Sequence, residues 1–483
     1  MNLNILLNNV DVTNSVGSIK KIINKIQFDS RKVEKNDLFI ALKGTEVNGH
    51  DYIEKSIQYG ASVVVCEKLP ELLSSSVQYI VTKDNNITLA ILASNFYNSP
   101  SSKIKLVGIT GTNGKTSIAS LLYQLFSNLN YKVGLISTIE NRILKVVLKT
   151  SHTTPDPLQI NFLLSEMVKQ KCTHCFMEVS SHAISQERTF SLDFDGAVFT
   201  NITHDHLDYH KTFLNYINIK QKFFTNLKKN AFSIINKDDK NGEIMVQNSK
   251  SRKLTYALSN NANYKVKILE SHFEGMMLDF NGVNVWVKLI GKFNAYNLLA
   301  AYATADLLGL PSNKIVEGIS LLSPADGRFE VFRSSKDVFI VLDYAHTEDA
   351  LLNVLMTIKK ISNKFRSIIT VFGCGGDRDA SKRPKMTLQA CKLSSQVIIT
   401  EDNPREENQN DIVSDMTNGL DSLLKDKVLV INDRKSAIKT AFALAQKNDV
   451  ILIAGKGHEK YQEKNGVKKM FDDKKEIFKH IIN

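Results

Sequence analysis

A glycine-rich segment that ends in lysine and threonine carries the clearest chemistry in the sequence. Residues 109–116 read Ile-Thr-Gly-Thr-Asn-Gly-Lys-Thr and stand between a β-branched run and a helical pattern. A phosphate-binding loop requires that setting, because backbone N–H groups and the positive end of a helix then face phosphate oxygens. We expect Lys115 to reach the β- and γ-phosphates of a nucleotide and the Thr116 hydroxyl to bind Mg²⁺. The residues expected to wrap the phosphates are Gly111, Thr112, Asn113 and Gly114.

The strict form of this motif has glycine where the chain has Ile109. The alternative is therefore a tight glycine turn with an incidental lysine. The position between a strand and a helix favours nucleotide binding.

Carboxylate and imidazole side chains form a second group. Glu178 lies near the end of the short apolar run 175–179, and the segment 200–210 contains three histidines and two aspartates. A carboxylate at the end of a buried strand near a phosphate loop is a natural Mg²⁺ ligand, because Mg²⁺ prefers hard oxygen atoms. Taken alone, the histidine-rich segment could also suggest zinc.

Lys220 and the pair Cys172 and Cys175 have ordinary interpretations. Lys220 stands four residues after Tyr216 in an amphipathic helix expected over 213–229, where a lysine is usually solvent-exposed.

The two cysteines have the spacing of half a zinc site, but no second cysteine pair lies nearby in the sequence. We interpret them as incidental thiols.

Length and composition indicate a globular protein of about three domains, with 483 residues of which 43% are hydrophobic and 23% charged. No window approaches the roughly 18 apolar residues of a membrane span, and the N-terminus lacks the basic region of a signal peptide. Five scattered cysteines fit free thiols in a reducing compartment, which predicts a cytoplasmic location. We expect no membrane insertion, and we expect a monomer.

The net charge of +12 would fit a nucleic-acid partner or polyanionic ligands such as nucleotides and carboxylates. Lysine and arginine are spread along the chain and form no basic arm or stripe. We therefore expect no nucleic acid.

Alternating strand and helix patterns predict an α/β fold with parallel sheets. A strand over Lys105–Thr110 precedes a helix over Lys115–Asn128, and further strands are expected at 368–372, 397–400 and 450–454. Breaks near 98–103 and 323–328 divide the chain into domains of residues 1–97, 98–324 and 325–483. Ligands of parallel sheets bind beyond the carboxyl ends of strands, so the loops that follow these strands are the expected sites.

The Gly-Thr-Asn-Gly-Lys-Thr loop resembles that of the Mur ligases and their folylpolyglutamate synthase relatives, and at least eight motifs in all match that family in order along the chain. The resemblance implies an N-terminal α/β UDP-binding domain, a central P-loop mononucleotide-binding domain with a parallel sheet, and a C-terminal Rossmann-like domain. It also implies that ATP converts a substrate carboxylate to an acyl phosphate, from which an amine displaces phosphate. The first domain is divergent and rich in Asn and Lys.

The same resemblance assigns a metal and nucleotide site. Asp-His-Leu-Asp implies His206 as a ligand of a second Mg²⁺, and Tyr-x-x-x-Lys implies that Lys220 takes up CO₂ to become a carbamate with oxygen ligands. His204, His210, Asp205 and Asp208 would then support the site. The implied catalytic residues are Lys115, Lys220, Glu178 and His206, and the implied metal ligands are Thr116, Glu178, His206 and Lys220. The ATP side would be completed by Asn294, Arg328, Asp343 and His346.

Two segments resemble those that hold a UDP-muramoyl dipeptide in this family. Residues 151–157 and 178–188 would hold its peptide and sugar portions through Thr153, Thr154, Ser180, Gln186 and Arg188. Residues 28–31 and 41–44 resemble the uridine-diphosphate-binding region, with Ser30 as the expected contact.

Three loops of the last domain suit a zwitterionic amino acid. The loops 373–379, 402–405 and 455–459 offer guanidinium groups, which pair with carboxylates through two oxygens, and Glu459, which can pair with an ammonium. Asp-Asn-Pro-Arg resembles the tetrapeptide of the diaminopimelate-adding members, whereas lysine-adding members differ at the position of Arg405. The expected contacts are Arg378, Asp402, Asn403, Pro404, Arg405, Gly455 and Glu459.

The resemblance thus implies a ligase that adds meso-2,6-diaminopimelate to UDP-N-acetylmuramoyl-L-alanyl-D-glutamate in peptidoglycan synthesis. Alternatives are the L-lysine-adding ligase, a folylpolyglutamate synthase, and a P-loop kinase or nucleotide switch. The first-domain motifs and residues 402–405 argue against folylpolyglutamate synthesis. A kinase or switch would need neither Lys220 nor His206 nor an amino-acid pocket.

Overall fold

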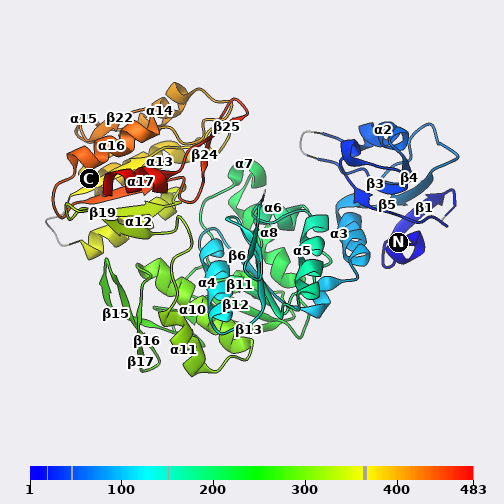
Figure 1. Ribbon diagram of the computed structural model, residues 1–483, viewed down its shortest axis with the longest axis horizontal. Coiled ribbons are helices and arrows are strands. Elements are labelled where there is room, and N and C mark those ends of the chain that lie inside the picture. Colours follow the sequence, from blue (N-terminus) through cyan, green and yellow to red (C-terminus); the bar gives the residue numbers. More distant parts are fainter. Residues whose placement is uncertain (19, 45–46, 151, 363–366, 482–483) are drawn as a thin grey trace.

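The computed structural model describes residues 1–18, 20–44, 47–150, 152–362 and 367–481. Three large sheets of five, nine and six strands follow one another along the chain, and two smaller sheets accompany them. The three regions lie in a row, with the middle of the chain between the N-terminal and C-terminal regions (Figure 1). This mixed α/β architecture agrees with the prediction from the sequence. No described helix combines the length and the apolar character that crossing a membrane requires.

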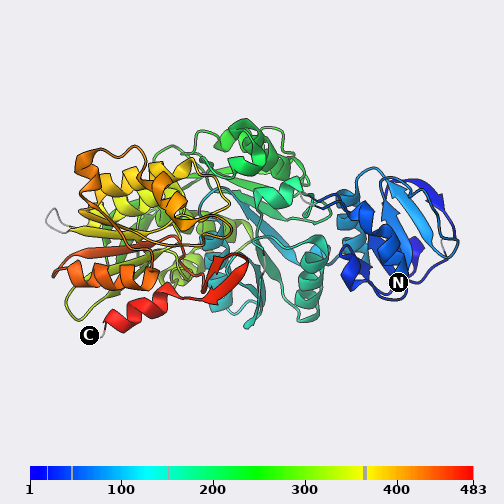
Figure 2. The same ribbon diagram turned by 90° about the horizontal axis from the view of Figure 1, so that it is seen from above.

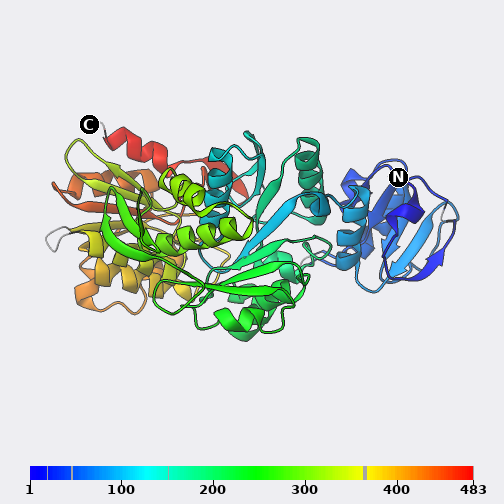
Figure 3. The ribbon, with the colours of Figure 1, turned by 90° about the horizontal axis from the view of Figure 1, so that it is seen from below.

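The first region contains a five-stranded sheet in the order β1-β5-β4-β3-β2, which is parallel except for β1 at its edge. Alternate side chains of its central strands enter two different apolar clusters, so both faces are covered. Figures 2 and 3 show this region at one end of the molecule. Its elements are α1 (Leu3–Leu6), β1 (Val12–Val16), β2 (Ile26–Gln27), η1 (Ser30–Lys32), β3 (Asp37–Ile40), η2 (Gly49–Tyr52), α2 (Ile53–Gln58), β4 (Ala61–Cys66), β5 (Gln78–Thr82) and α3 (Asn85–Phe96).

The middle region is built on a nine-stranded sheet in the order β14-β13-β12-β11-β6-β10-β7-β8-β9. The strands are parallel except β8, which runs antiparallel to its neighbours β7 and β9 near one edge. Its elements are η3 (Pro100–Lys103), β6 (Lys105–Thr110), α4 (Lys115–Asn128), β7 (Val133–Ile136), β8 (Asn141–Ile143), β9 (Val146–Leu148), α5 (Pro157–Lys169), β10 (His174–Glu178), α6 (Ser181–Ser185), β11 (Gly196–Phe199), α7 (Leu207–His210), α8 (Phe213–Thr225), β12 (Phe232–Asn236), α9 (Gly242–Val246), β13 (Arg252–Ala257) and β14 (Tyr264–Lys265).

Strand β6 lies between β10 and β11, and this neighbourhood positions the phosphate loop. The register pairs Ile109 with Glu178 on one side and Thr110 with Phe199 on the other. Because the three strands are parallel, their carboxyl ends meet at one edge of the sheet. The phosphate loop, Glu178 and the segment that begins at Thr200 therefore emerge side by side.

The last region contains a six-stranded sheet in the order β18-β19-β23-β20-β21-β22, parallel except for β18. Its loops at 343–347, 373–379, 401–405 and 455–459 follow β19, β20, β21 and β23 at one edge. Its elements are β18 (Glu330–Arg333), β19 (Phe339–Asp343), α12 (Glu348–Ile361), β20 (Ile368–Phe372), α13 (Lys382–Leu393), β21 (Gln396–Ile399), α14 (Gln409–Thr417), α15 (Ser422–Lys425), β22 (Val428–Val430), α16 (Arg434–Leu444), β23 (Val450–Ala454), β24 (Tyr461–Lys464), β25 (Val467–Met470) and α17 (Asp473–Ile481).

A small antiparallel sheet joins the middle and last regions. Phe273, between its first two strands, stacks on Phe339 of β19 with ring centroids 4.4 Å apart, and both rings are buried. The sheet therefore contributes an anchor to the core of the last region. Its strands and the helices that follow are β15 (Lys267–His272), β16 (Gly275–Phe280), β17 (Val283–Val287), α10 (Lys292–Leu307) and α11 (Ser312–Ser320).

Most of the predicted elements are confirmed with small shifts at their ends. The strands at 105–110, 368–372 and 450–454 and the helix at 115–128 have the predicted bounds, and the strand predicted at 397–400 spans Gln396–Ile399. The helix predicted over 213–229 was wrong at its end, because α8 stops at Thr225. There the chain turns so that Leu227 can enter the core before β12 begins at Phe232.

Candidate active site

A cleft of about 1570 Å³ lies where the strand ends of the middle and last regions face each other. It is lined by the phosphate loop, by Glu178, His206 and Lys220, and by the loops of the last region that contain Arg405 and Glu459. Among the predicted site residues, those that do not line it are Ser30, Gly111, Gln186 and Pro404. The structure thus brings the nucleotide, metal and amino-acid residues of the prediction into one cavity.

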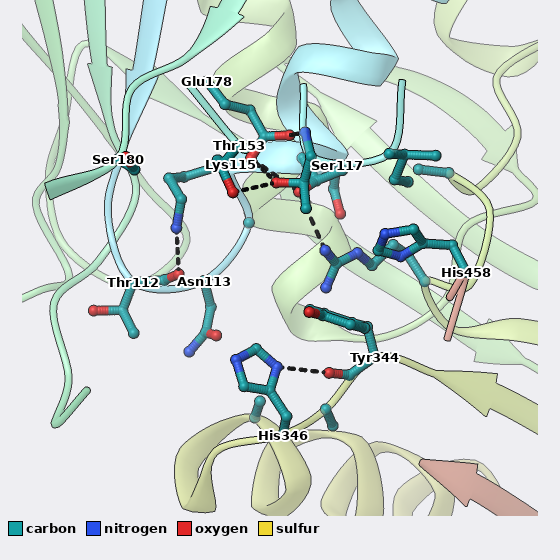
Figure 4. Close-up of a pocket in the computed structure, with 18 of the residues that line it drawn as sticks. Thr112, Asn113, Lys115, Ser117, Thr153, Glu178, Ser180, Tyr344, His346 and His458 are labelled. Carbon is teal, nitrogen blue, oxygen red and sulfur yellow. Dashed lines mark hydrogen bonds between the residues drawn. The ribbon is translucent and has the colours of Figure 1, made fainter. Parts of the chain in front are cut away.

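The phosphate loop has glycine where side chains cannot be placed. Gly111 has φ +147°, and a Cβ atom there would lie 1.8 Å from Thr200 Oγ1. Gly114, with φ +91°, precedes α4, so the first N–H groups of this helix are available to an anion. Lys115 is half-buried, and its Nζ donates to the carbonyl oxygens of Gly111 (2.9 Å) and Thr112 (2.8 Å). Its side chain therefore folds back over the phosphate loop (Figure 4).

Glu178 is a carboxylate of the cleft that several donors hold in place. Its side chain is fully buried and accepts hydrogen bonds from Thr116 Oγ1 (3.0 Å), Thr138 N (2.8 Å) and Thr138 Oγ1 (3.1 Å). Burial raises the pKa of Glu178, and Lys115 and these donors oppose the shift. The hydroxyl of Thr116 and the carboxylate of Glu178 are hard oxygen donors that fit Mg²⁺. Sequence reasoning missed Thr138, although it closely follows β7 at the same sheet edge.

Lys220 is buried, with an exposed fraction of 1%, so the alternative of an ordinary solvent-exposed lysine does not hold. Its Nζ lies 3.0 Å from the Gly111 carbonyl oxygen and 4.8 Å from the centre of the Tyr216 ring. Burial and the nearby Lys115 lower the pKa of Lys220 well below the usual range. A lowered pKa favours the neutral amine, which is the form that can react with CO₂. By contrast, Lys222 is partly exposed and paired with Glu187.

The histidine-rich segment divides into three environments. His206 has φ +54° and lies 3.3 Å from Asp205, and burial lowers the pKa of His206 to about 3. His210 is buried with Nε2 2.9 Å from Ser181 Oγ, and His204 lies 3.4 Å from Asp379 of the last region. Within the described ranges, no three or more His, Cys, Asp or Glu side chains form a group that could hold a metal ion.

Cys172 and Cys175 are free buried thiols.

Arg328 connects the phosphate loop with the last region. Its Nη2 donates to Thr116 Oγ1 (3.2 Å), and its guanidinium lies 4.4 Å from the centre of the Tyr344 ring. The Nε of Arg328 is buried without a hydrogen-bond partner in the described structure, which leaves a donor for a ligand. Sequence reasoning missed Tyr344, which stands between the predicted residues Asp343 and His346.

The remaining predicted nucleotide residues fix the loops around Arg328. Asp343 accepts the N–H groups of Phe329 and Ala345, each at 2.7 Å, and burial raises the pKa of Asp343 to about 6. His346 Nδ1 lies 2.9 Å from the Tyr344 carbonyl oxygen (Figure 4). Asn294 donates to the Ile290 carbonyl oxygen at 2.8 Å.

The residues expected to hold the muramoyl dipeptide interlock beside Glu178. Thr154 Oγ1 donates to the Glu178 carbonyl oxygen (2.8 Å) and accepts from Ser180 N (3.0 Å). Arg188 donates to the Thr154 carbonyl oxygen (2.7 Å) and to Gln186, so Gln186 orients Arg188 from outside the cleft. Thr153 Oγ1 lies 3.0 Å from Thr138 Oγ1.

Of the predicted peptide and uridine sites, one residue is not described and one lies in the first region. Ser151, the first residue of the 151–157 motif, is outside the described residues. Ser30 is buried in the first region. Beside it, Phe28 and Asp29 line a separate pocket of about 380 Å³ that also includes Tyr97 and Asp156.

The amino-acid loops of the last region are tied to one another. Asn403 Nδ2 donates to Glu459 Oε2 (2.8 Å), and Arg405 Nη1 donates to the Gly376 carbonyl oxygen (2.6 Å). Arg405 has φ +52°, a left-handed conformation that its backbone bonds to residues 463 and 465 maintain. Arg378, Asp402 and Gly455 line the same part of the cleft.

Comparison with known proteins agrees with this geometry. Three family models match successive parts of the chain: "Mur ligase family, catalytic domain" over residues 22–97, "Mur ligase middle domain" over 109–305 and "Mur ligase, glutamate ligase domain" over 327–457.

Curated relatives match the chain over its whole length. Proteins of Bacteroides thetaiotaomicron and Cytophaga hutchinsonii, both named UDP-N-acetylmuramoyl-L-alanyl-D-glutamate–2,6-diaminopimelate ligase, are each 50% identical to it. The alignment covers all of this chain and 100% and 99% of those proteins, respectively.

Solved structures share the fold. A structure with the same ligase name has a TM-score of 0.69 at 32% identity and covers 100% of this chain and 98% of its own. A MurF ligase from Thermotoga maritima in complex with ADP has a TM-score of 0.63 at 18% identity, with coverage of 89% and 93%, a likeness of fold alone. From the motifs, the cleft and these matches together, we conclude that the chain belongs to the Mur ligase family.

Proposed function

We propose that this protein is an ATP-dependent ligase that joins meso-2,6-diaminopimelate to UDP-N-acetylmuramoyl-L-alanyl-D-glutamate in peptidoglycan synthesis. The observation that carries the proposal is the single cleft, in which a phosphate loop faces the loops that contain Arg405 and Glu459. The names of the relatives at 50% identity support the same substrates. A kinase or nucleotide switch would not need the part of this cleft that contains Arg405 and Glu459.

In the proposed reaction, Lys115 and Arg328 bind the γ-phosphate of ATP while it passes to the D-glutamate carboxylate. Thr116, Glu178, His206 and Lys220 as a carbamate would hold Mg²⁺, which when bound offsets negative charge on the phosphate. Thr153, Thr154 and Arg188 orient the peptide. The neutral amine of diaminopimelate then attacks the acyl carbon and a C–N bond forms. The single bond from that carbon to the phosphate oxygen breaks, phosphate leaves with its electrons, and the nitrogen loses a proton.

Three further features belong to the proposal. Its domains comprise residues 1–97, 98–324 and 325–483, each with its own large sheet. The first binds the uridine diphosphate through the surroundings of Ser30. The protein works as a monomer in the cytoplasm, a compartment in which five free thiols persist.

The experiment is product analysis by mass spectrometry. The enzyme receives UDP-muramoyl dipeptide, ATP, Mg²⁺ and an equimolar mixture of diaminopimelate, L-lysine and other amino acids, and ATP hydrolysis is followed with each component omitted. We expect the diaminopimelate adduct as the main product and hydrolysis that requires both peptide and amino acid. A lysine adduct would assign the lysine-adding activity, and hydrolysis without an acceptor would favour a nucleotide switch.

A further inference from the structure

Glu459 is held in place by three donors at the wall of the amino-acid pocket. Its Oε2 accepts from Asn403 Nδ2 (2.8 Å) and Lys456 Nζ (3.2 Å), and its Oε1 lies 3.3 Å from the Tyr344 hydroxyl. Glu459 and Asn403 line the cleft, whereas Lys456 does not. A carboxylate with this many donors keeps one orientation.

Lys456 is fully buried, which is unusual for lysine. Besides Glu459, its Nζ donates to Asn403 Oδ1 (3.1 Å), and it lies 5.6 Å from the centre of the Tyr461 ring. The same Asn403 oxygen accepts the N–H group of Glu463 (2.9 Å). One ammonium therefore ties the loop after β23 to the loop after β21.

A second buried cation fixes the start of both loops. Arg434 and Asp473 are almost fully buried and form two hydrogen bonds, of 2.8 and 2.7 Å. Arg434 also donates to the carbonyl oxygens of Ala454 (2.9 Å) and Glu401 (3.4 Å), which directly precede Gly455 and Asp402. Arg434 thus fixes the backbones of the two loops, whereas Lys456 fixes the side chains of Glu459 and Asn403.

We propose that Lys456 is a positioning residue for the amino-acid substrate. It fixes Glu459 and Asn403 in the geometry that receives the substrate's ammonium, and it acts through them without touching the substrate. The proposal rests on the function proposed above. A side chain that is already ordered loses little freedom when the ligand binds, so this arrangement favours affinity for the amino acid and not the chemical step.

The test compares Lys456→Met, Lys456→Gln and Lys435→Met by steady-state kinetics. Lys456→Met should raise KM for diaminopimelate about tenfold, since an ordered charged partner of Glu459 is lost. The KM values for ATP and the muramoyl peptide should stay within about twofold, and Lys456→Gln, which keeps a donor, should be intermediate. Lys435, exposed on α16 beside Arg434, is the matched control and should show no change.

A double-mutant cycle separates positioning from general support of the fold. In a Glu459→Gln background, Lys456→Met should add little, because its effect passes through the missing carboxylate. Any of four results would overturn the inference. The losses from the two substitutions could multiply, KM for diaminopimelate could stay unchanged, all three KM values could rise equally, or both Lys456 variants could fail to fold. If the wild type does not ligate diaminopimelate, the proposed function itself fails and this inference falls with it.

Discussion

At the scale of single residues, Lys115 lies over the phosphate loop with its ammonium near two carbonyl oxygens and not in an apolar core. We expect Lys115→Ala to fold normally and to lose at least about 10²-fold in turnover, because a cation that offsets charge in the phosphoryl transfer is removed. ATP hydrolysis with all substrates and the circular dichroism spectrum are the measurements. Near-normal turnover of a folded variant would contradict the assignment of the loop.

Lys220 offers a test of the carbamate. Lys220→Ala should be nearly inactive, because the oxygen ligands expected for Mg²⁺ are lost, and short-chain carboxylic acids should restore part of the activity. Lys222→Ala is the matched control, since Lys222 lies on the same helix, is partly exposed and pairs with the largely buried Glu187. Turnover is measured with and without added acetate or propionate. A deficit in Lys222→Ala and not in Lys220→Ala would show that the wrong lysine was chosen.

His174 should make the stability depend on pH. It is buried at the start of β10 among aromatic rings, far from the strand ends that form the cleft, and burial lowers the pKa of His174 to about 4 from its usual 6.5. Between these values the unfolded chain binds the proton and the folded chain does not. The free energy of unfolding therefore falls as pH falls from 6.5 towards 4, by up to about 1.4 kcal/mol per pH unit for this group.

Urea unfolding of the wild type and of His174→Gln at pH 5, 6 and 7 measures the effect. The variant should have a shallower pH dependence by up to that amount. His272→Gln, an exposed histidine on β15, should keep the wild-type slope. Equal slopes for the wild type and His174→Gln would mean that His174 titrates alike in both states.

At the scale of elements, the loop after β21 and the strand β24 act together on Arg405. The Arg405 N–H group donates to the Glu463 carbonyl oxygen (3.1 Å), and the Arg405 carbonyl oxygen accepts from Asn465 (2.8 Å). These bonds hold a left-handed residue whose guanidinium lies beside Gly376. The hairpin of β24 and β25 therefore presents the group that we expect to read the distal carboxylate of diaminopimelate.

Arg405→Ala should lower kcat/KM for diaminopimelate by at least about 30-fold, which is equivalent to about 2 kcal/mol. This value is the lower end of the range for breaking a charge pair, and it applies because this pair is partly exposed. Residual activity with lysine should change far less, because lysine has no carboxylate at its distal end. The measurement is kcat/KM for both amino acids, with the exposed Arg333→Ala on β18 as control. Equal losses for both substrates would place Arg405 at the shared end of the amino acid or in support of the fold.

The elements that the sequence predicts well are those with local signals. The strand and helix around the phosphate loop and the strands β20 and β23 follow from apolar runs bounded by glycine. The burial of Lys220 could not be predicted from its helix alone. Helical periodicity identifies the apolar face of the helix, but it does not say which polar side chain points into a ligand site. Thr138 and Lys456 were missed for a related reason. Their partners, Glu178 and Asn403, are 40 and 53 residues away along the chain.

At the scale of the whole molecule, the middle and last regions touch directly across the cleft. Asn113 Nδ2 of the phosphate loop donates to Asp349 Oδ2 of α12 (3.1 Å), and His204 faces Asp379. Both contacts join residues that flank the site, so they bridge the two regions directly. In sites built from two domains, closure completes the set of contacts to the ligand and excludes water.

Asp349→Ala should open the molecule. A single hydrogen bond of this kind contributes about 0.5–1.5 kcal/mol, so its loss should shift the ratio of open to closed forms by roughly two- to tenfold. Small-angle X-ray scattering should report a larger radius of gyration for Asp349→Ala than for Asp426→Ala, an exposed aspartate at the end of α15. Identical scattering from both variants would show that this contact does not hold the regions together.

The five cysteines are distributed so that every region contains at least one: Cys66 in the first, Cys172 and Cys175 in the middle, and Cys374 and Cys391 in the last. All are buried, and burial raises the pKa of Cys66 to about 11 and that of Cys374 to about 12. A thiolate-seeking reagent therefore reacts only when a region transiently unfolds. Timed alkylation of the native chain, read peptide by peptide, would give a separate opening rate for each region without any engineered label.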